Sequence, residues 1–332
     1  MRSLVATVLA AVLFTGSLPA VAAEWPAKPI RLIVPTAAGG AADLMGRTFA
    51  TALAPALGQQ FVIDNRPGAG GAIATESMVR VEPDGYTLMV SGLPYHVLGP
   101  AMNTNASFDP IRDFTHIAFF GGSPMVLVVH PSLGVQRFAQ LSALSAESKS
   151  GIDYVSPGFG SVGNMVAEYL ASRARLNLRH VPYKGGSAAV VDLVAGHIKL
   201  GSLTWSTALP HVRAGVLRPI AISSTQRLAE FPDLPTFAEL GFDDIVVTAW
   251  FSLSGPAGVP DAIVERLNRL VNQVMASAEV RQSLERDASV TKPMTPAEFT
   301  AFVRSEVEKW TPVVRTFAKP KLACLDFQPP GA

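Results

Sequence analysis

The sequence has very little cysteine and almost no net charge. Cys324 is its single cysteine, which excludes an intrachain disulfide, a cysteine metal cluster and a lipid-anchored cysteine behind a leader. The 27 lysines and arginines are balanced by 26 aspartates and glutamates, so no excess of positive charge is available to neutralise a phosphate backbone or an acidic membrane surface. The composition therefore argues against nucleic acid as a partner.

Long apolar segments are also missing, except at the N-terminus. Arg2 precedes an apolar run over 4–14, and small residues follow up to Ala23, which is the three-part pattern of a secretory signal peptide. A retained membrane anchor is the alternative, but it needs about 18 or more uninterrupted apolar residues, and polar, glycine and proline residues break this run over 15–19. We expect residues 1–23 to be a cleaved signal peptide and the protein to be periplasmic.

The rest of the chain alternates apolar strand-like segments with helical ones. With 332 residues, of which 48% are hydrophobic, it is long enough for two α/β domains built on parallel sheets with crossover helices. The predicted strands are 30–34, 61–65, 86–91, one from 125 onward, 152–156, 178–183, 198–203, 218–224 and 246–256. The predicted helices follow the first strand and cover 72–80, 163–175, 187–195, 260–277, 279–287 and 296–317.

Two short links would join these α/β units. They lie near 122–127 and 245–252 and would form a two-segment hinge with a cleft between the sheets. We expect domain I to contain 24–124 and 248–332, and domain II to contain 125–247. Ligands of such sheets bind at the C-terminal ends of the strands, so the cleft is the expected binding site.

The helix predicted after the first strand has a regular spacing of small and apolar residues and a recognisable C-terminal end. Leu44, Thr48, Ala52 and Ala56 recur every four residues, so we expect them on one stripe of an amphipathic helix. Gly58 follows, and glycine readily takes the left-handed conformation of a helix C-cap. This helix should therefore stop there.

Two strand-loop-helix junctions repeat one plan. IRLIVPTAAGGAADLMGR covers 30–47, and about 120 residues later IDYVSPGFGSVGNMVAEYL covers 152–170. The first N–H groups of a helix have no intrahelical partner and carry the positive end of its dipole, so each junction can bind an anion. For one such loop, tight turns and capping are the alternative; two junctions at one cleft favour an organic acid.

Motifs of catalysis and of cofactor binding fit poorly. GFGSVG at 158–163 matches the dinucleotide pattern, but the next strand, 178–183, offers no acid for a ribose hydroxyl. No P-loop occurs, Ser161 lacks the surroundings of a hydrolase elbow, and the six histidines show no metal-ligand spacing. We therefore expect no catalytic residue, cofactor or metal. The alternative is a secreted α/β enzyme acting on a small organic acid, which a Ser161–histidine–carboxylate arrangement would support.

Several ordered blocks resemble one family. They span about Trp25 to Phe317 and read WPAKPIRLIVP, DNRPGAGG, PDGYTL, FDPIRDF, VVHPS, HVPYKGG, ALPHVRAG and SGPAGVP. Together they resemble the Bug family, the periplasmic solute-binding receptors of tripartite tricarboxylate transporters. The resemblance implies a type II periplasmic-binding-protein fold that closes around a small organic carboxylate. It also implies delivery of that ligand to membrane permease subunits, or signalling to a sensor protein.

The resemblance further implies which residues bind the ligand. Backbone amides and ordered water at the two helix N-termini would hold one carboxylate, without a dedicated arginine. The expected contacts are Thr36, Ala37, Ala38, Gly39, Gly40, Asp43, Ser91, Gly92, Ser156, Gly158, Phe159, Gly160, Ser161, Asn164, Lys184, Gly185, Leu203, Thr204 and Trp205. For Asp43, stabilisation of the helix dipole is an equally open role, because an acid repels a carboxylate.

This chain departs from the family pattern around the expected pocket. Residues 36–38 read Thr-Ala-Ala where Phe-Pro-Pro is common, and Leu203 stands where members often carry an aspartate. Phe159 and Trp205 would make the far end apolar and suit an aromatic or branched acid; the alternative is that Trp205 belongs to the core. Because an ammonium group would lack an acidic partner at Leu203, we expect amino acids such as aspartate to be disfavoured.

Overall fold

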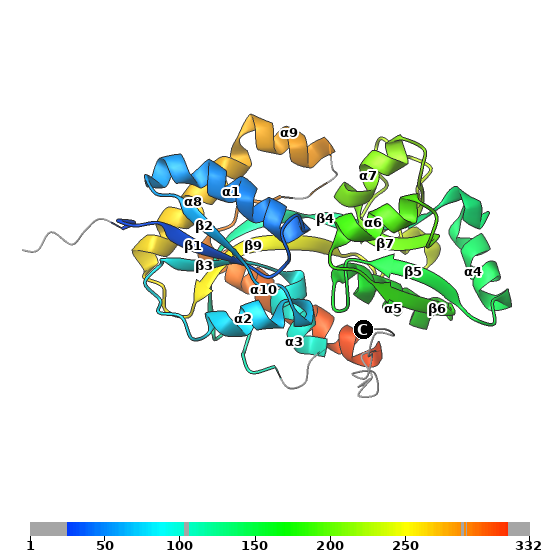
Figure 1. Cartoon of the computed structure of the whole chain (residues 1–332), viewed down its shortest axis with the longest axis horizontal. Helices are drawn as coiled ribbons and strands as arrows, with labels where there is room; N and C mark the ends of the chain where they lie inside the picture. The colour runs from blue at the N-terminus through cyan, green and yellow to red at the C-terminus, as the bar shows by residue number, and fades with distance from the viewer. Residues whose placement is uncertain (1–24, 103–105, 287–288, 290, 318–332) are drawn as a thin grey trace, which may run out of the picture.

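A computed structural model describes residues 25–102, 106–286, 289 and 291–317. The expected signal peptide and Cys324 lie outside these residues. Two β-sheets share one long strand, so that their nine strands form one continuous hydrogen-bonded array, and helices cover both (Figure 1). Among the described residues, no helix combines the length and the apolar character that a membrane span requires. The two-sheet α/β architecture is the one that the strand and helix pattern predicts, but the sheets are mixed, because several strand pairs are antiparallel.

The first sheet carries the first junction. Its strands, in spatial order, are β2 (Phe61–Asn65), β1 (Ile30–Val34), β3 (Thr87–Gly92), β9 (Thr248–Pro256) and β4 (Phe114–Val129). β1, β2 and β3 are parallel, as strands joined by crossover helices are expected to be, and β9 runs antiparallel to both of its neighbours. Apolar side chains on both faces of β1 are buried, as in a strand between two helix layers.

The second sheet carries the second junction. β4 continues into it and pairs with β7 (Leu200–Thr204), followed by β5 (Ile152–Ser156) and β6 (Leu178–Pro182). β8 (Arg218–Ile222) pairs with β4 as well. Because β5 is parallel to β6 and to β7, the loops that follow these strands leave the sheet at one edge.

β4 is one continuous strand of 16 residues through both sheets. Up to Pro124 it pairs with β9, and from Met125 onward it pairs with β7 and β8. The prediction of a strand beginning at Met125 is therefore wrong, since β4 begins at Phe114. Nearly all of its residues are buried, which removes the alternation that marks a strand, and Gly122 and Pro124 are typical strand breakers.

The change of partner within β4 coincides with the boundary that we propose between two lobes. We call residues 25–124 and 248–317 the first lobe and residues 125–247 the second lobe. The first lobe contains α1 (Ala41–Leu57), α2 (Ala72–Met78), α3 (Gly99–Met102), α8 (Asp261–Ala276), α9 (Ala278–Arg286) and α10 (Pro296–Phe317). The second contains α4 (Phe138–Glu147), α5 (Val162–Ala174), α6 (Gly186–Val194) and α7 (Trp205–Arg213).

Helix α1 ends where the sequence predicts, but the predicted stripe is not the buried side of the helix. Gly58 is its C-cap in the left-handed conformation, with φ 67°. The stripe that begins at Leu44 is solvent-exposed, whereas Phe49, Leu53 and Leu57 are buried. Because small apolar residues occur around this whole alanine-rich helix, their spacing alone does not determine which side packs on the sheet.

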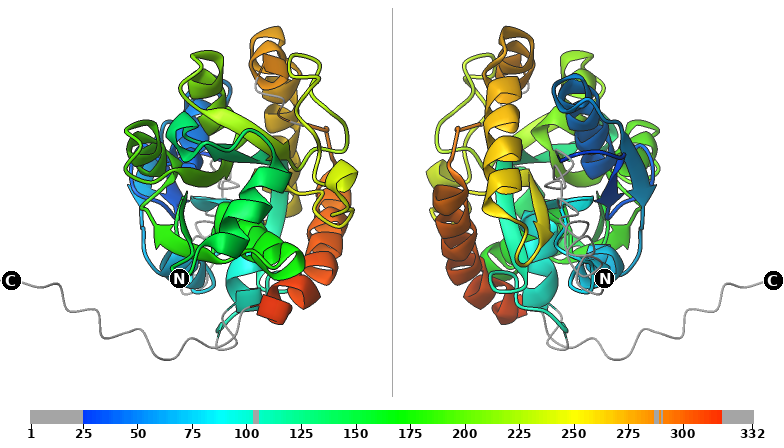
Figure 2. Two further views of the ribbon diagram at one scale, coloured as in Figure 1. Left: turned by 90° about the vertical axis from the view of Figure 1, so that its right-hand side faces the viewer. Right: turned by 90° about the vertical axis from the view of Figure 1, so that its left-hand side faces the viewer.

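Helix α10 packs against both lobes. It contacts β4 and the π-helical turn η2 (Leu93–Leu98) of the first lobe, and α5 of the second. Its buried residues Phe299, Val303 and Trp310 belong to the same apolar cluster as Val166 of α5. Figure 2 shows α10 beside α8 along one side of the molecule. This helix therefore forms part of the joint between the lobes.

Candidate functional site

The first junction, residues 35–40, connects β1 to α1. Gly39 has φ +80°, a left-handed conformation that glycine adopts without steric cost. Gly40 is the N-cap of α1 and provides no side-chain cap, so the first N–H groups of α1 lack that partner. Ala38 and Gly39 are exposed, whereas Thr36 and Ala37 are partly buried. The junction thus presents backbone and small side chains.

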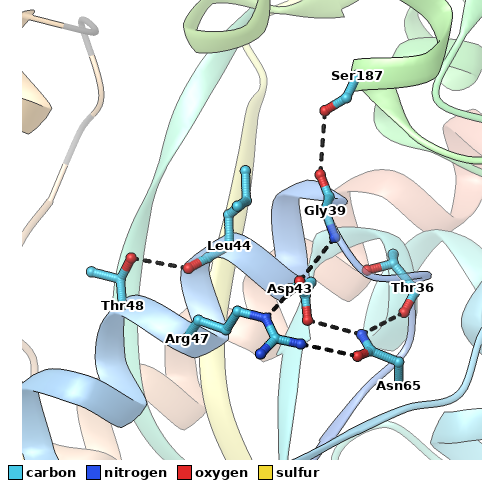
Figure 3. A network of polar contacts seen from close by, with 8 residues as sticks. All are labelled: Thr36, Gly39, Asp43, Leu44, Arg47, Thr48, Asn65 and Ser187. Carbon is cyan, nitrogen blue, oxygen red and sulfur yellow. Dashed lines mark hydrogen bonds and ion pairs between the residues drawn. The ribbon is translucent and has the colours of Figure 1, made fainter.

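Asp43 holds this junction in shape. Its side chain is buried, and its Oδ2 accepts hydrogen bonds from the Gly39 N–H and from Arg47 Nε, both at 2.9 Å. Asn65 Nδ2 donates to Asp43 Oδ1 and to the Thr36 carbonyl, also at 2.9 Å (Figure 3). Burial raises the pKa of Asp43, but the bonds from Arg47, Gly39 and Asn65 outweigh it, so the pKa lies below its ordinary value. The carboxylate is ionised at neutral pH, and Arg47 balances its charge.

The second junction, residues 156–164, is closed by its own hydrogen bonds. Ser161 is the N-cap of α5: its Oγ accepts from the Asn164 N–H at 3.2 Å and donates to the Gly158 carbonyl at 2.7 Å. The Gly160 N–H donates to Asn164 Oδ1 at 3.2 Å. A Cβ on Gly158 would lie 2.8 Å from the Tyr183 carbonyl, so this position requires glycine.

A serine–histidine contact occurs, but with Ser156 in place of Ser161. Ser156 Oγ lies 2.7 Å from His180 Nε2, and His180 Nδ1 lies 3.3 Å from Asn164 Nδ2. Ser156 is fully buried, so its hydroxyl has no access to a substrate. The contact stabilises the junction and is not a catalytic triad. Within the described residues, no group of three or more His, Cys, Asp or Glu side chains could hold a metal ion.

The start of α6 brings the two junctions together. Gly185, with φ 122°, donates its N–H to the Pro157 carbonyl of the second junction at 2.9 Å. Ser187 donates its hydroxyl to the Gly39 carbonyl of the first junction at 3.3 Å (Figure 3). Lys184 is solvent-exposed. The N-terminal ends of α1, α5 and α6 therefore converge from both lobes.

A second contact between the lobes involves a loop that the sequence did not single out. From Gly68 to Gly71, four consecutive residues have positive φ (134°, 47°, 65° and 95°). A Cβ on Gly70 would lie 3.2 Å from the Phe159 carbonyl of the second junction. The Phe159 side chain is 65% exposed. The glycines of the DNRPGAGG block indicate a tight loop here, but they do not indicate its approach to Phe159, which is distant in sequence.

Ser91 and Gly92 lie inside the first lobe, at the end of β3. Ser91 is buried, and its Oγ lies 2.7 Å from the hydroxyls of both Ser252 and Ser254 on β9. A Cβ on Gly92 would lie 2.4 Å from the Trp250 carbonyl. Packing of β3 on β9 explains both residue types, and a ligand contact by either stays a prediction.

Leu203 and Trp205 belong to the core of the second lobe. Both are almost fully buried in one apolar cluster, and the Trp205 ring meets Phe231 edge to face with centroids 5.0 Å apart. Thr204 is the N-cap of α7, and its Oγ1 lies 2.8 Å from Thr207 Oγ1. The structure therefore favours the core interpretation of Trp205 over a pocket-lining one.

Comparison with known proteins identifies the family. The model of the tripartite tricarboxylate transporter family receptor matches residues 45–318. The chain belongs to this receptor family. Protein BugT of Bordetella pertussis (strain Tohama I) is 33% identical over 298 residues, which are 90% of this chain and 91% of BugT. The Bug family resemblance seen in the sequence is thereby confirmed.

Solved structures of similar receptors confirm the fold. The R. palustris protein Rpa4515 with adipate has a TM-score of 0.82 and 30% identity, covering 88% of this receptor and 98% of that chain. The periplasmic binding protein BugD has a TM-score of 0.81 and 25% identity, covering 88% and 98%. The chain is therefore a solute-binding receptor with a periplasmic-binding-protein fold, and the enzyme alternative is wrong.

Proposed function

We propose that this receptor captures a small organic carboxylate between its lobes and delivers it to a tripartite tricarboxylate-type membrane transporter. The convergence of the N-terminal ends of α1, α5 and α6 carries the proposal, because the first N–H groups of a helix have no intrahelical partner and carry the positive end of its dipole. Rpa4515 was solved with adipate, a dicarboxylate, which supports this chemistry in a receptor of the same fold.

Backbone groups, rather than a cationic side chain, would supply the preference for an anion. Arg47 is already paired with Asp43, at 2.9 Å. Lys184 is exposed beside the start of α6. The exposed Ala38 and Gly39 of the first junction and the partly buried Gly158 of the second carry no large side chain that would keep a ligand away from the backbone.

The location and the partners follow from the same proposal. The leader-like residues 1–23 and the likeness to BugD, a periplasmic binding protein, support a periplasmic location. Permease subunits of the transporter would then receive the ligand at the membrane. A sensor protein as a further partner stays a prediction.

A thermal-shift panel tests the ligand class. It would contain adipate, malate, benzoate, aspartate and, as a neutral control, glucose. A ligand at about 100 times its Kd adds roughly 2.7 kcal/mol of stability, so at least one acid should raise the melting temperature clearly while glucose does not. No response to any acid, or a response to glucose alone, contradicts the proposal.

The same panel tests the role of Leu203. Leu203 is buried in the core, so this position offers no acidic group to an ammonium, and aspartate should shift the melting temperature less than malate at equal concentration. Aspartate as the tightest ligand would show that this expectation is wrong while leaving the carboxylate proposal intact.

A further inference from the structure

One hydrogen bond joins the two junctions across the lobes. Ser187, the second residue of α6, donates its hydroxyl to the carbonyl of Gly39, 148 positions away in the sequence, at 3.3 Å. The backbones are also close at this point, because a Cβ on Gly185 would lie 3.9 Å from Gly40 Cα. We call the Ser187–Gly39 hydrogen bond the latch. It exists only while the lobes are together.

The direction of the Gly39 carbonyl is determined within the first lobe. The Gly40 N–H donates to the Ala37 carbonyl at 3.2 Å, and in a trans peptide the preceding carbonyl points the opposite way. The Gly39 N–H donates to Asp43 Oδ2 at 2.9 Å. Both peptide groups that flank Gly39 are therefore held, and its carbonyl is presented to the second lobe.

The Asp43 carboxylate is itself held. Arg47 Nε and Asn65 Nδ2 each donate to it at 2.9 Å, and Arg47 Nη2 lies 3.4 Å from Asn65 Oδ1 (Figure 3). These contacts come from α1 and from β2, so the carboxylate connects the first junction to two elements of the first lobe. Movement of the Gly39 carbonyl would require this network to rearrange.

We propose that Asp43 is a positioning residue for lobe closure. By holding Gly39 it directs the carbonyl to Ser187, and the latch then stabilises the closed arrangement even without ligand. The purpose of such closure rests on the proposed function, but the latch acts on the ligand-free protein and can be measured there. One neutral hydrogen bond of this kind shifts the ratio of closed to open molecules by about fivefold.

Distances between spin labels on the two lobes report closure directly. Val62 on β2 and Val191 on α6 are 56% and 64% exposed, one on each lobe, so cysteines at these positions accept labels without entering the core. Cys324→Ser removes the native thiol. The purified protein would be unfolded in urea, washed and refolded before measurement, to remove any ligand that co-purifies.

Three variants would be compared in this labelled background. Ser187→Ala removes the latch donor, and Asp43→Asn removes the charge that pairs with Arg47. Ser277→Ala is the matched control, because among the described contacts the exposed hydroxyl of this α8 C-cap residue bonds only the Val274 carbonyl, at 2.7 Å. The double variant Asp43→Asn/Ser187→Ala tests whether both residues act through one contact.

We expect Ser187→Ala to lower the ratio of closed to open molecules in the distance distribution by about fivefold. Asp43→Asn should lower this ratio as well, and the double variant should lower it no further than Ser187→Ala alone. Ser277→Ala should match the wild type. A Ser187→Ala distribution equal to that of the wild type overturns the latch, whatever the fate of Asp43→Asn. A lower melting temperature for Asp43→Asn with an unchanged distribution, or additive effects in the double variant, overturns the positioning role. Because no ligand is present, none of these outcomes depends on the thermal-shift panel.

Discussion

Two buried histidines should make the receptor less stable below neutral pH. His96 is fully buried, and neither ring nitrogen has a hydrogen-bond partner among the described residues. Its ring centroid lies 5.3 Å from that of His116, which is also buried and places Nε2 3.0 Å from the Pro110 carbonyl. Burial lowers the pKa of His116 to about 4, although the Pro110 contact opposes it. Burial, and then the proximity of His116, lower the pKa of His96 well below its ordinary value.

The sign and size of the effect follow from proton binding. An unfolded histidine binds a proton below its ordinary pKa of about 6.5, whereas these folded rings stay neutral. As the pH is lowered, the unfolded state therefore gains protons and the free energy of unfolding decreases. The slope approaches about 1.4 kcal/mol per pH unit for each ring below pH 6.5, so each ring removes about 2 kcal/mol between pH 7 and 5. Both together remove about 4 kcal/mol, a large part of a typical stability of 5–15 kcal/mol. Stability is full above about pH 6.5 and is lost as the pH falls towards about 4, where His116 becomes protonated in the folded state.

Urea unfolding at about pH 7, 6 and 5 measures this loss in a range where most carboxylates of both states are ionised. Histidine-selective ¹⁵N NMR of the folded protein reports the two rings directly. His197→Gln is the control, because its side chain is 72% exposed and both buried rings remain in place. The reasoning is refuted if stability is equal at about pH 7 and 5, or if both rings become protonated near pH 6.5.

Three further sets of changes separate effects on the site from effects on the fold. Gly39→Ala and Gly58→Ala both place a side chain at positive φ (80° and 67°) with open space around it, so each should lower the free energy of unfolding by about 1–2 kcal/mol. Only Gly39→Ala should also weaken the thermal shift caused by the acid that binds. Equal weakening in both variants would contradict the proposed ligand site. Trp205→Ala should lower the urea-derived stability by about 3–5 kcal/mol with little change in the Kd of that acid, and a large loss of affinity in folded protein would instead place Trp205 in the pocket. Gly163→Ala should destabilise the second lobe by about 1–3 kcal/mol or more, because its Cβ would lie 2.3 Å from the Ser202 carbonyl; an unchanged melting temperature would show that this close approach is absent.

Elements with clear boundaries could be predicted from the sequence. β1, β2 and β5 match the expected ranges to the residue, because each is a short segment rich in β-branched and aromatic residues and flanked by turn residues. The first part of β4 and helix α7 could not be predicted. Pairing with β9 overrides the breaking tendency of Gly122 and Pro124. Helix α7 begins at Trp205 directly after β7, and its N-cap Thr204 is also the last residue of the strand, so no loop separates the two elements.

The candidate site shows the same division between local and tertiary information. Both glycine-rich junctions were visible, since a strand, a loop and a helix start are adjacent in sequence. The contacts that shape the site were not: Asn65 reaches Asp43 across 22 positions, and Ser187 reaches Gly39 across 148. These pairs depend on how β2 lies beside β1 and on how the lobes meet, and neither is encoded in spacing along one chain.

Asp43 shows why an acid beside an anion site is compatible with carboxylate binding. A free carboxylate at the start of α1 would repel an anionic ligand. Here both Asp43 oxygens accept hydrogen bonds, and Arg47 balances the charge at 2.9 Å, so the N–H groups of α1 remain the dominant local charge for an incoming anion. The two roles open from the sequence, dipole stabilisation and ligand contact, did not include the one seen in the structure, which is to determine the shape of the loop. The residue type follows from this role, since only an ionised acid of this length can accept from the loop N–H, the arginine of the next turn and an amide of the neighbouring strand at once.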